Sequence, residues 1–538
     1  MQTILVTDKY HPAGLDALQS SSDLTVIYRT GMSRAELLDV IPQAHALIVR
    51  SATKVTAEVI EAGKQLKVIA RAGVGVDNID VTAASRKGIV VTNCPSGNTI
   101  SAAEHTMSLL LSLARRVPQA NQAVKAGVWD RTGKYMGTEI TGKIIGVLGL
   151  GRIGAEVATR SLGLKMRVLA YDPFVTEDRA RQLKVELMPL DELLGQVDFV
   201  TLHVPRSEQT ENLLDRDRLM RIKPGAYLIN CSRGGIVDEE ALAEVIASGH
   251  LAGAALDVFK TEPPAADHPL LKLENVIVTP HLGASTAEAQ EKVSVETAIG
   301  VVEGLTTGHF PNAVNLPDVP PATLAEIGPT LELVQRLGSF LAQLIDGSLA
   351  HVHILYAGHV ASQPTRILTA ALLKATLEHV LGEGINYVNA PLLAEERCIV
   401  VKETRQLHAV DYTSLIKVVM GTEKGEWAVV GTLFGAHEPR IVKLDEFALE
   451  ASPVGDMLVF SNYDQPGVIG RIGNLLGDAG VNIAGMQLGR RKVGGQAVAI
   501  VNVDSALSPE LLEKLRALPQ IIDARFVQLP EHNRSAVL

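Results

Sequence analysis

Cysteine is scarce in this chain, and long apolar runs are missing. Only three cysteines occur in 538 residues, Cys94, Cys231 and Cys398, and they are widely separated. Their odd number and spacing fit a reducing compartment and exclude a metal cluster of the usual ligand spacing. The N-terminal segment has no basic stretch followed by a long apolar one, and nothing elsewhere approaches a membrane span. We therefore expect a cytoplasmic protein that holds no metal.

Charge of one sign is not concentrated anywhere either. The chain has 50 Lys and Arg against 60 Asp and Glu, a net charge of −10, with no block of like charge. We therefore expect neither nucleic acid nor an anionic membrane surface as a partner. Hydrophobic residues make up 46% and charged residues 20%, which is typical of a soluble α/β protein. The length predicts about three or four domains.

Short apolar stretches alternate with helical ones from the first residues. This alternation predicts a parallel sheet with crossover helices. A long helix from residue 101 to 116, for which Ser101 and Glu104 offer a capping box, should lead into a second such sheet. The expected strands of the first sheet are residues 4–7, 24–28, 46–49, 68–70 and 90–92. Those of the second are residues 144–148, 168–170, 199–202, 227–229, 254–256 and 276–279.

The most specific motif is the sequence GLGRIG at residues 149–154. It follows an apolar strand and opens a helix, and Asp172 comes eighteen residues after Gly154, at the end of the next strand. Gly149 permits the tight turn, Gly151 lets the backbone approach a pyrophosphate, and Gly154 allows close helix–strand packing. The helix N-terminus then faces the phosphates. Since Asp172 can accept hydrogen bonds from ribose hydroxyls and would repel a 2′-phosphate, the motif predicts NAD as the cofactor.

Four polar residues follow the last three strands of the second sheet. In an open α/β sheet ligands bind beyond the carboxyl ends of the strands, so Arg233, Asp257, Glu262 and His281 should converge there. Histidine suits proton transfer near neutral pH, and Glu262 would hold one tautomer of His281. The planar guanidinium of Arg233 suits a substrate carboxylate. Asp257 is expected to hold the nicotinamide carboxamide.

Each of these assignments has a competing interpretation. His281 could be a loop residue with satisfied hydrogen bonds, Glu262 only a loop acid, and Arg233 an ion-pair residue that holds two loops. Cys231, next to the arginine, is interpreted as a small buried residue, because no base is evident to make it a nucleophile.

The remainder of the chain is less specific. A helix over residues 286–303 should return to the first domain, and the proline-rich stretch 311–321 predicts a boundary. Residues 322–453 indicate a mixed α/β unit without a nucleophile elbow, phosphate loop or metal spacing. Residues 457–529 show strand, helix, strand, strand, helix, strand order, typical of a ferredoxin-like module, whose second helix should begin at Ser508-Pro509.

Together the motifs resemble those of the D-isomer-specific 2-hydroxyacid dehydrogenases, and the layout is similar to the long D-3-phosphoglycerate dehydrogenases of that family. The resemblance covers essentially the whole chain. It rests on VRSATKVT at 49–56, RAGVGVDNID at 71–80, GLGRIG at 149–154, NCSRGGIVDE at 230–239, ALDVF at 255–259 and TPHLGAST at 279–286.

The resemblance implies NAD-dependent oxidation of 3-phospho-D-glycerate to 3-phosphohydroxypyruvate, the first step of phosphorylated L-serine biosynthesis. It implies an α/β fold in which a doubly wound, parallel-sheet nucleotide-binding domain is inserted in a flavodoxin-like substrate domain. A mixed α/β intervening domain and a ferredoxin-like ACT regulatory domain follow. The expected boundaries are 1–98 and 285–316 for the substrate domain, 99–284 for the NAD domain, 317–453 for the intervening domain and 454–530 for the ACT domain.

The resemblance also implies site residues. Arg233 is the substrate anchor, Glu262 the partner acid and His281 the acid–base. The implied cofactor-binding residues are Val74, Gly149, Gly151, Arg152, Ile153, Gly154, Asp172, Val204, Cys231, Ser232, Asp257, Gly283 and Ala284. The implied substrate-binding residues are Arg50, Ser51, Arg71 and Gly73, with Arg131 or Lys134 reaching in from a neighbouring subunit. Val74 and Val204 stand where many relatives have threonine, which removes two possible hydroxyl contacts.

For the ACT domain the resemblance implies an amino-acid effector between paired modules, at Asp464 and Asn482. L-serine is the expected effector, although some relatives carry asparagine where this chain has Asp464. The competing interpretation is assembly, with sheets pairing across subunits into a homotetramer.

Two alternative functions stay open. Reduction of glyoxylate, hydroxypyruvate or another 2-oxo acid is disfavoured by Arg50, Arg71 and the regulatory tail. An NAD-sensing corepressor is disfavoured because Arg233, Glu262 and His281 are all present.

Overall fold

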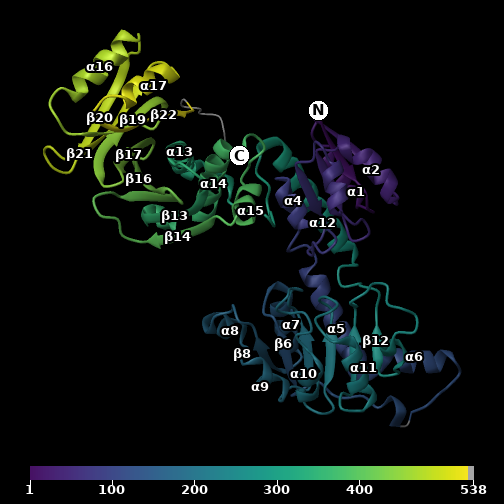
Figure 1. Ribbon diagram of the computed structural model, residues 1–538. Helices are drawn as coiled ribbons and strands as arrows, with labels where there is room; N and C mark the ends of the chain where they lie inside the picture. The colour runs from purple at the N-terminus through teal and green to yellow at the C-terminus, as the bar shows by residue number, and fades with distance from the viewer. Residues whose placement is uncertain (132, 531–538) are drawn as a thin grey trace. The chain divides into compact units, whose positions relative to one another are not determined.

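The computed structural model describes residues 1–131 and 133–530 (Figure 1). The chain divides into two compact units. Unit 1 comprises Met1–Lys9, Asp16–Asn93 and the chain from Thr297 onward, and unit 2 comprises Tyr10–Leu15 and Cys94–Glu296. In the described ranges, every helix lacks the combination of length and apolarity that crossing a bilayer requires.

The first sheet of unit 1 is parallel, with the strand order β2-β1-β3-β4-β5. This is the flavodoxin-like order that the family resemblance implied. Val49 pairs with Arg71, so the carboxyl ends of β3 and β4 lie next to each other. The strands are β1 (Gln2–Val6), β2 (Leu24–Tyr28), β3 (Ala46–Val49), β4 (Val68–Arg71) and β5 (Val90–Thr92). The helices that follow these strands in sequence are α1 (Pro12–Leu18), α2 (Arg34–Val40), α3 (Ala57–Ala62) and α4 (Val81–Arg86). Much later in the chain, α12 (Ala287–Thr307) belongs to unit 1 from Thr297 onward.

Unit 2 is a doubly wound domain around a parallel sheet of order β12-β11-β10-β9-β6-β7-β8. All six predicted strands are present, and the very short β8 is added at one edge. The strands are β6 (Ile144–Leu148), β7 (Arg167–Tyr171), β8 (Glu186–Leu187), β9 (Phe199–Leu202), β10 (Tyr227–Asn230), β11 (Gly253–Leu256) and β12 (Val276–Val278). The helices are α5 (Thr99–Arg115), α6 (Val117–Lys125), α7 (Arg152–Gly163), α8 (Glu177–Leu183), α9 (Leu190–Leu194), α10 (Arg216–Arg221) and α11 (Glu239–Ala247).

The predicted start of the long helix α5 was wrong. The helix begins at Thr99, after Asn98, so Ser101 lies inside its first turn and not at a cap. The Ser101 hydroxyl is hydrogen-bonded to Thr286 at 2.7 Å, so it is engaged by another segment of unit 2. Ser101 therefore makes a tertiary contact, although its sequence pattern resembled that of a helix cap.

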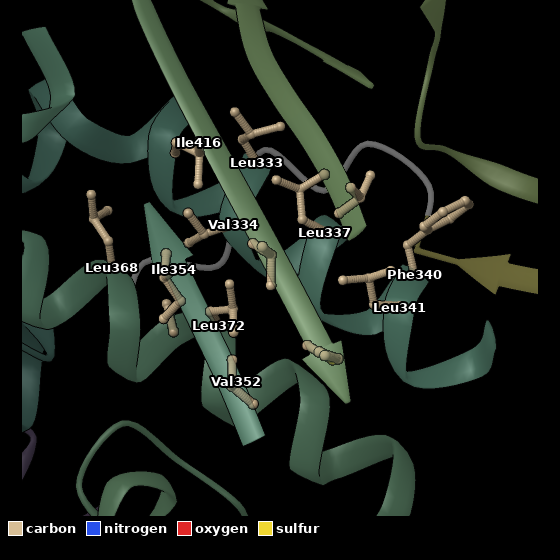
Figure 2. Close-up of a cluster of buried hydrophobic side chains, with 14 of the residues drawn as sticks. Leu333, Val334, Leu337, Phe340, Leu341, Val352, Ile354, Leu368, Leu372 and Ile416 are labelled. Atoms are coloured by element: carbon tan, nitrogen blue, oxygen red, sulfur yellow. The ribbon is translucent and has the colours of Figure 1, made fainter. Parts of the chain in front are cut away.

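The intervening part of unit 1 packs α13 (Pro321–Leu344) and α14 (Thr365–Leu381) on one face of a six-stranded sheet. Figure 2 shows its core, where Leu333, Val334 and Leu337 of α13 meet Val352 and Ile354 of β13. The sheet has the order β14-β13-β15-β16-β17-β18. The other elements are β13 (Leu349–Gly358), α15 (Asn389–Glu396), β14 (Val400–Gln406), β15 (Ser414–Thr422), β16 (Gly425–Phe434), β17 (Glu438–Leu444) and β18 (Phe447–Ala451).

The last segment has the predicted ferredoxin-like order, with an antiparallel sheet β20-β21-β19-β22. Its second helix is capped by Ser508, whose side chain accepts from the Leu511 N–H, and Pro509 is its first residue. One sheet face packs under α16 and α17, while Met457 and Val459 of the other face join the core around α13. The elements are β19 (Gly455–Tyr463), α16 (Val468–Asp478), β20 (Ile483–Arg490), β21 (Gln496–Val503), α17 (Pro509–Arg516) and β22 (Ile521–Leu529).

Candidate active site

The geometry of the glycine-rich turn in unit 2 gives a steric reason for two of its three glycines. Gly149 has φ +94°, and a Cβ there would lie 2.7 Å from the carbonyl oxygen of His203. A Cβ on Gly154 would collide with the carbonyl oxygen of Gly149, so the helix can approach the strand only without a side chain. Around Gly151 there is open space, and no side chain caps α7 at this residue. An uncapped helix N-terminus beside open space fits a dinucleotide pyrophosphate.

Asp172 follows β7 and is tied to this turn. Its carboxylate accepts hydrogen bonds from the Leu150 N–H at 2.8 Å and from the Phe174 N–H at 2.9 Å. Arg152 begins α7 and is exposed, and Ile153 is half-buried beside it. These contacts fix the position of the acid relative to the turn that would hold the phosphates.

Val204 follows β9, next to a half-buried histidine that the sequence did not single out. Burial lowers the pKa of His203 to about 3, so its imidazole is neutral. The ring is hydrogen-bonded to the Thr201 hydroxyl at 3.0 Å. His203 therefore packs the floor of the turn as a neutral group.

His281 and Glu262 form a hydrogen-bonded pair in unit 2. His281 Nδ1 lies 2.9 Å from Glu262 Oε2, while Glu262 Oε1 accepts from the Phe259 N–H at 3.1 Å. The hydrogen bond that His281 donates to Glu262 raises the pKa of His281 above its ordinary value, against the opposing effect of burial. Burial would raise the pKa of Glu262, but the hydrogen bond from His281 and that from Phe259 lower it on balance. The pair therefore favours imidazolium and carboxylate.

Asp257 holds the loop that carries His281. It is 1% exposed, and its carboxylate accepts from the Leu282 N–H at 2.7 Å and the Gly283 N–H at 2.8 Å. Thr279 donates its hydroxyl to the same carboxylate at 2.6 Å, and His105 Nε2 lies 3.2 Å away. His281 has φ +56°, and its backbone N–H bonds the Asp257 and Thr279 carbonyl oxygens. Asp257 thus fixes an otherwise unfavourable backbone conformation, a role that the sequence did not reveal.

His105 was also missed at the sequence level. It lies on α5, and only the packing of unit 2 brings it to Asp257 and Thr279. Its hydrogen bond is one of the contacts that lower the pKa of Asp257 against the effect of burial. Gly283 is buried beside this carboxylate, and the Ala284 carbonyl accepts from Gln290 at 2.8 Å.

Arg233 lies in a tight turn after β10. Its guanidinium donates to the Ser232 carbonyl oxygen at 2.7 Å, and Asn230 bonds both the Arg233 carbonyl and the Ser232 hydroxyl. The positive charge of Arg233 is near enough to His281 to oppose the rise in the histidine pKa. The structure therefore brings Arg233, Glu262 and His281 together, as the positions of their strands led us to expect.

Cys231 is next to the arginine but is not activated. Burial raises its pKa to about 12, so the thiol is protonated at neutral pH. Burial and the carboxylate of Glu296 likewise raise the pKa of Cys94 to about 12. Within the described ranges there is no group of three or more His, Cys, Asp or Glu side chains that could hold a metal ion.

Two arginines lie side by side at the carboxyl ends of β3 and β4 in unit 1. Arg50 is fixed through its backbone, because its N–H donates to Asp8 at 2.6 Å and its carbonyl accepts from Asn78 at 2.7 Å. Arg71 donates to the Ala72 carbonyl at 2.7 Å, and a Cβ on Gly73 would collide with its guanidinium. The absence of a side chain at Gly73 therefore provides the space that the Arg71 guanidinium occupies.

Several predicted residues around these arginines have simpler surroundings. Ser51 is exposed, and Val74 is half-buried, with its carbonyl accepting from Asn93 at 2.6 Å. Asp8 and Asn78, which position the Arg50 loop, were not found from the sequence. Each acts through a hydrogen bond between its side chain and the backbone of Arg50, and no sequence motif predicts such a contact.

Of the remaining predicted residues, Arg131, Lys134 and Asn482 are exposed and Asp464 is half-buried. Arg131 and Lys134 are both exposed, and the Lys134 ammonium lies 3.6 Å from Glu274. In the ACT segment Asp464 accepts from Arg490 at 2.8 Å and from the Gly494 N–H at 3.1 Å, which lowers its pKa. Asn482 is exposed and donates to Asp504 at 2.6 Å. The Asp464 carboxylate is thus already paired with a cation.

Three family models match the chain. The D-isomer specific 2-hydroxyacid dehydrogenase NAD binding domain matches residues 107–283, the D-3-phosphoglycerate dehydrogenase intervening domain matches 326–445, and the ACT domain matches 457–520. Among whole proteins, the D-3-phosphoglycerate dehydrogenase of Archaeoglobus fulgidus is 44% identical, over 98% of this chain and 100% of that protein. That of Synechocystis sp. is 43% identical, over 98% and 95%.

Solved structures resemble more than half of the chain. A D-lactate dehydrogenase from Aquifex aeolicus, complexed with NAD and lactic acid, has a TM-score of 0.51 and 32% identity. The match covers 57% of this chain and 96% of that one. A glyoxylate reductase from Paecilomyes thermophila has a TM-score of 0.53 and 27% identity, over 58% and 98%.

Proposed function

The chain belongs to the D-3-phosphoglycerate dehydrogenases, NAD-dependent oxidoreductases within the D-isomer specific 2-hydroxyacid dehydrogenase family, and on this premise we propose how its own residues act. The reaction converts 3-phospho-D-glycerate and NAD to 3-phosphohydroxypyruvate and NADH. It requires removal of the hydroxyl proton, a fixed carboxylate and a bound phosphate. When bound, NAD accepts the hydride.

His281 is the base that takes the hydroxyl proton. Its Nδ1 is engaged by Glu262 at 2.9 Å, which leaves Nε2 to face the substrate. The Glu262 carboxylate stabilises the imidazolium that forms, as the raised pKa of His281 indicates. The hydrogen bond between these two side chains is the single observation that carries the proposal.

Arg233 holds the substrate carboxylate. Its guanidinium is a permanent cation that can bind a carboxylate with two parallel hydrogen bonds. The contacts of Asn230 with Ser232 and with the Arg233 carbonyl fix the turn that presents it. Asp257 positions the loop of His281, and its expected contact with the nicotinamide carboxamide stays a prediction.

NAD is held by the turn around Gly149, Gly151 and Gly154. Arg152 and Ile153 at the start of α7 and Asp172 after β7 complete the pyrophosphate and ribose side of the site. The support is the uncapped helix N-terminus and the open space at Gly151. The other proposed cofactor contacts are those of Val74, Val204, Cys231, Ser232, Gly283 and Ala284.

Arg50 and Arg71 bind the substrate phosphate, assisted by Ser51 and Gly73. Two adjacent strand ends that each present a guanidinium suit a doubly charged anion. We extend this to Arg131 or Lys134 from a neighbouring subunit of a homotetramer that works in the cytoplasm. The domain boundaries at 98, 284, 316 and 453 are part of the same proposal.

The ACT domain supports regulation by a ligand, and we propose L-serine, bound between paired modules at Asp464 and Asn482. The ammonium of an amino acid would compete with Arg490 for the Asp464 carboxylate. Binding should therefore require the Arg490 side chain to move.

Substrate comparison tests the activity. NADH formation at alkaline pH is measured with 3-phosphoglycerate, D-lactate, D-glycerate and 2-hydroxyglutarate, each with and without L-serine. We expect the phosphorylated acid to give the highest kcat/KM by far and L-serine to slow its oxidation. Faster turnover of D-glycerate or 2-hydroxyglutarate would overturn the substrate assignment, and an unchanged rate with L-serine would overturn only the effector.

A further inference from the structure

The intervening sheet ends in a strand that is open to solvent on one side. β14 pairs with β13 alone, and every one of its residues except Glu403 is exposed. The opposite end of the sheet differs, because β18 packs next to β20 of the ACT segment. Among the described residues, β14 therefore presents unpaired backbone N–H and C=O groups, which are a template for pairing with another strand.

Apolar side chains gather at this edge. Val400 is 61% exposed, and in the loop that follows the strand Leu407 is 74% and Val410 79% exposed. Edge strands that are protected from association usually carry charges or proline in place of such residues. Three of the seven β14 residues, Lys402, Glu403 and Arg405, are charged, but no proline occurs between residues 400 and 410.

We propose that β14 is an interface between two copies of this chain, in which the two β14 strands pair antiparallel about a twofold axis through Thr404. This inference rests on the homo-oligomer proposed above and assigns the surface that makes it. The two six-stranded intervening sheets would join into one continuous sheet.

Side-chain alternation limits the possible registers. Residues Val401, Glu403 and Arg405 pair with the buried side of β13, so they face the helices, whereas Lys402 and Thr404 face away. Successive residues of a strand alternate between the two faces of its sheet. The helix-covered faces of the two copies therefore lie on the same side of the joined sheet only when the twofold axis passes through a residue. If the axis passed between two residues, side chains on the helix-covered face of one sheet would lie opposite side chains on the open face of the other.

Charge then selects among the central registers, those with the axis through one of residues 402 to 405. An axis through Lys402, Glu403 or Arg405 would place that charge directly opposite itself, which is destabilising. An axis through Thr404 places Glu403 of each copy opposite Arg405 of the other. Within one chain Glu403 already bonds Arg405 at 2.8 Å and the hydroxyls of Thr365 and Thr369. The twofold would thus create a balanced cluster of two acids and two guanidinium groups.

The same register covers apolar surface. It places Leu407 of one copy opposite Val401 of the other, on the face toward the helices. Val401 and Glu403 line a cavity of about 860 Å³ beside α14, together with Ala370 and Leu373. The second copy would therefore place an exposed leucine near the rim of an apolar cavity, removing both from water.

Cysteine cross-linking tests the register in the full chain. Cys398 is exposed, so the background carries Cys398→Ser. With the axis through Thr404, T404C faces its own copy within disulfide reach, and we expect a covalent dimer on mild oxidation. Each of K402C and Q406C alone lies about 14 Å from its own copy, beyond reach. Coexpressed K402C and Q406C chains should instead cross-link each other, in about half of the dimers by random pairing.

Light scattering provides the second measurement. R405E should raise the dissociation constant of this contact by about tenfold or more, because the opposite charges become like charges. R440E is the matched control, since Arg440 makes the same 2.8 Å bridge to the residue two before it, but on the inner strand β17.

The outcomes separate this inference from the oligomer itself. A covalent dimer with T404C and with the mixed pair, but not with the single controls, supports the register. Self-cross-linking of K402C or Q406C would overturn it. An oligomeric chain without any T404C cross-link would overturn the surface and leave the oligomer standing, whereas a monomeric chain would overturn both.

Discussion

His281 Nδ1 and Glu262 Oε2 lie 2.9 Å apart, and this hydrogen bond sets the charge state of the proposed base. It raises the pKa of His281 above the ordinary value of 6.5 and helps to lower the pKa of Glu262 below the ordinary value of 4.5. A raised histidine pKa stabilises the folded chain fully below pH 6.5, and this contribution is lost as the pH rises through the pKa that His281 has in the folded chain. A lowered carboxyl pKa stabilises above pH 4.5 and is lost on acidification. Both contributions are therefore present between these two values.

Removing the charge of Glu262 should move the pH profile of the reaction. In E262Q the pKa of His281 falls toward its ordinary value, so the rising limb of kcat/KM for oxidation should shift to lower pH. Loss of the carboxylate that stabilises the imidazolium should also lower kcat by roughly tenfold or more. The control is E239Q, because Glu239 pairs with His268 at 3.2 Å and does not contact His281. An E262Q profile with an unshifted pKa would contradict the role of the pair.

Replacing the base should reduce turnover without removing the cofactor. We expect H281N to lower kcat by about 10²- to 10⁴-fold, the usual contribution of acid–base catalysis. The dissociation constant for NADH, followed by its fluorescence, should change little, since the proposed cofactor contacts are made by other residues. A variant that retains most of its kcat would show that the proton is taken by another group.

The arginines of unit 1 should act on the phosphate. R50A and R71A each remove one charge-assisted interaction, so we expect KM for 3-phosphoglycerate to rise by roughly 10- to 100-fold. KM for D-glycerate, which has no phosphate, serves as the control and should change little. G73A should resemble R71A, because the added methyl group would occupy the position of the Arg71 guanidinium. Equal losses with both substrates would argue against phosphate binding.

The three thiols should differ widely in reactivity. Cys398 is exposed, whereas Cys94 is buried and Cys231 partly so, each with its pKa raised to about 12. The thiolate is the nucleophile, so iodoacetamide at neutral pH should label Cys398 first and leave the other two unmodified in the folded chain. Mass spectrometry of peptides from native and unfolded samples gives the measurement. Rapid labelling of Cys231 in the native chain would refute its assignment as a protonated, sheltered thiol.

Local signals determined much of this protein. Alternation of apolar strands with helices set the parallel sheets, because each βαβ unit is defined by its own stretch of chain. The three glycines were assigned roles from spacing alone, and the structure gives steric reasons at Gly149 and Gly154. The same rule that places ligands at strand ends predicted the meeting of Arg233, Glu262 and His281.

Contacts between distant segments were decided only by the tertiary structure. His105 on α5 and Asp257 after β11 are 152 positions apart, and no spacing rule joins them. Ser101 had the local pattern of a helix cap, yet a hydrogen bond to Thr286 uses its hydroxyl instead. Within residues 1–131 and 133–530, β14 pairs with β13 alone, and this likewise depends on how the whole sheet is ordered. Periodicity and turn chemistry act over a few residues, whereas these features depend on which surfaces meet once the chain has packed.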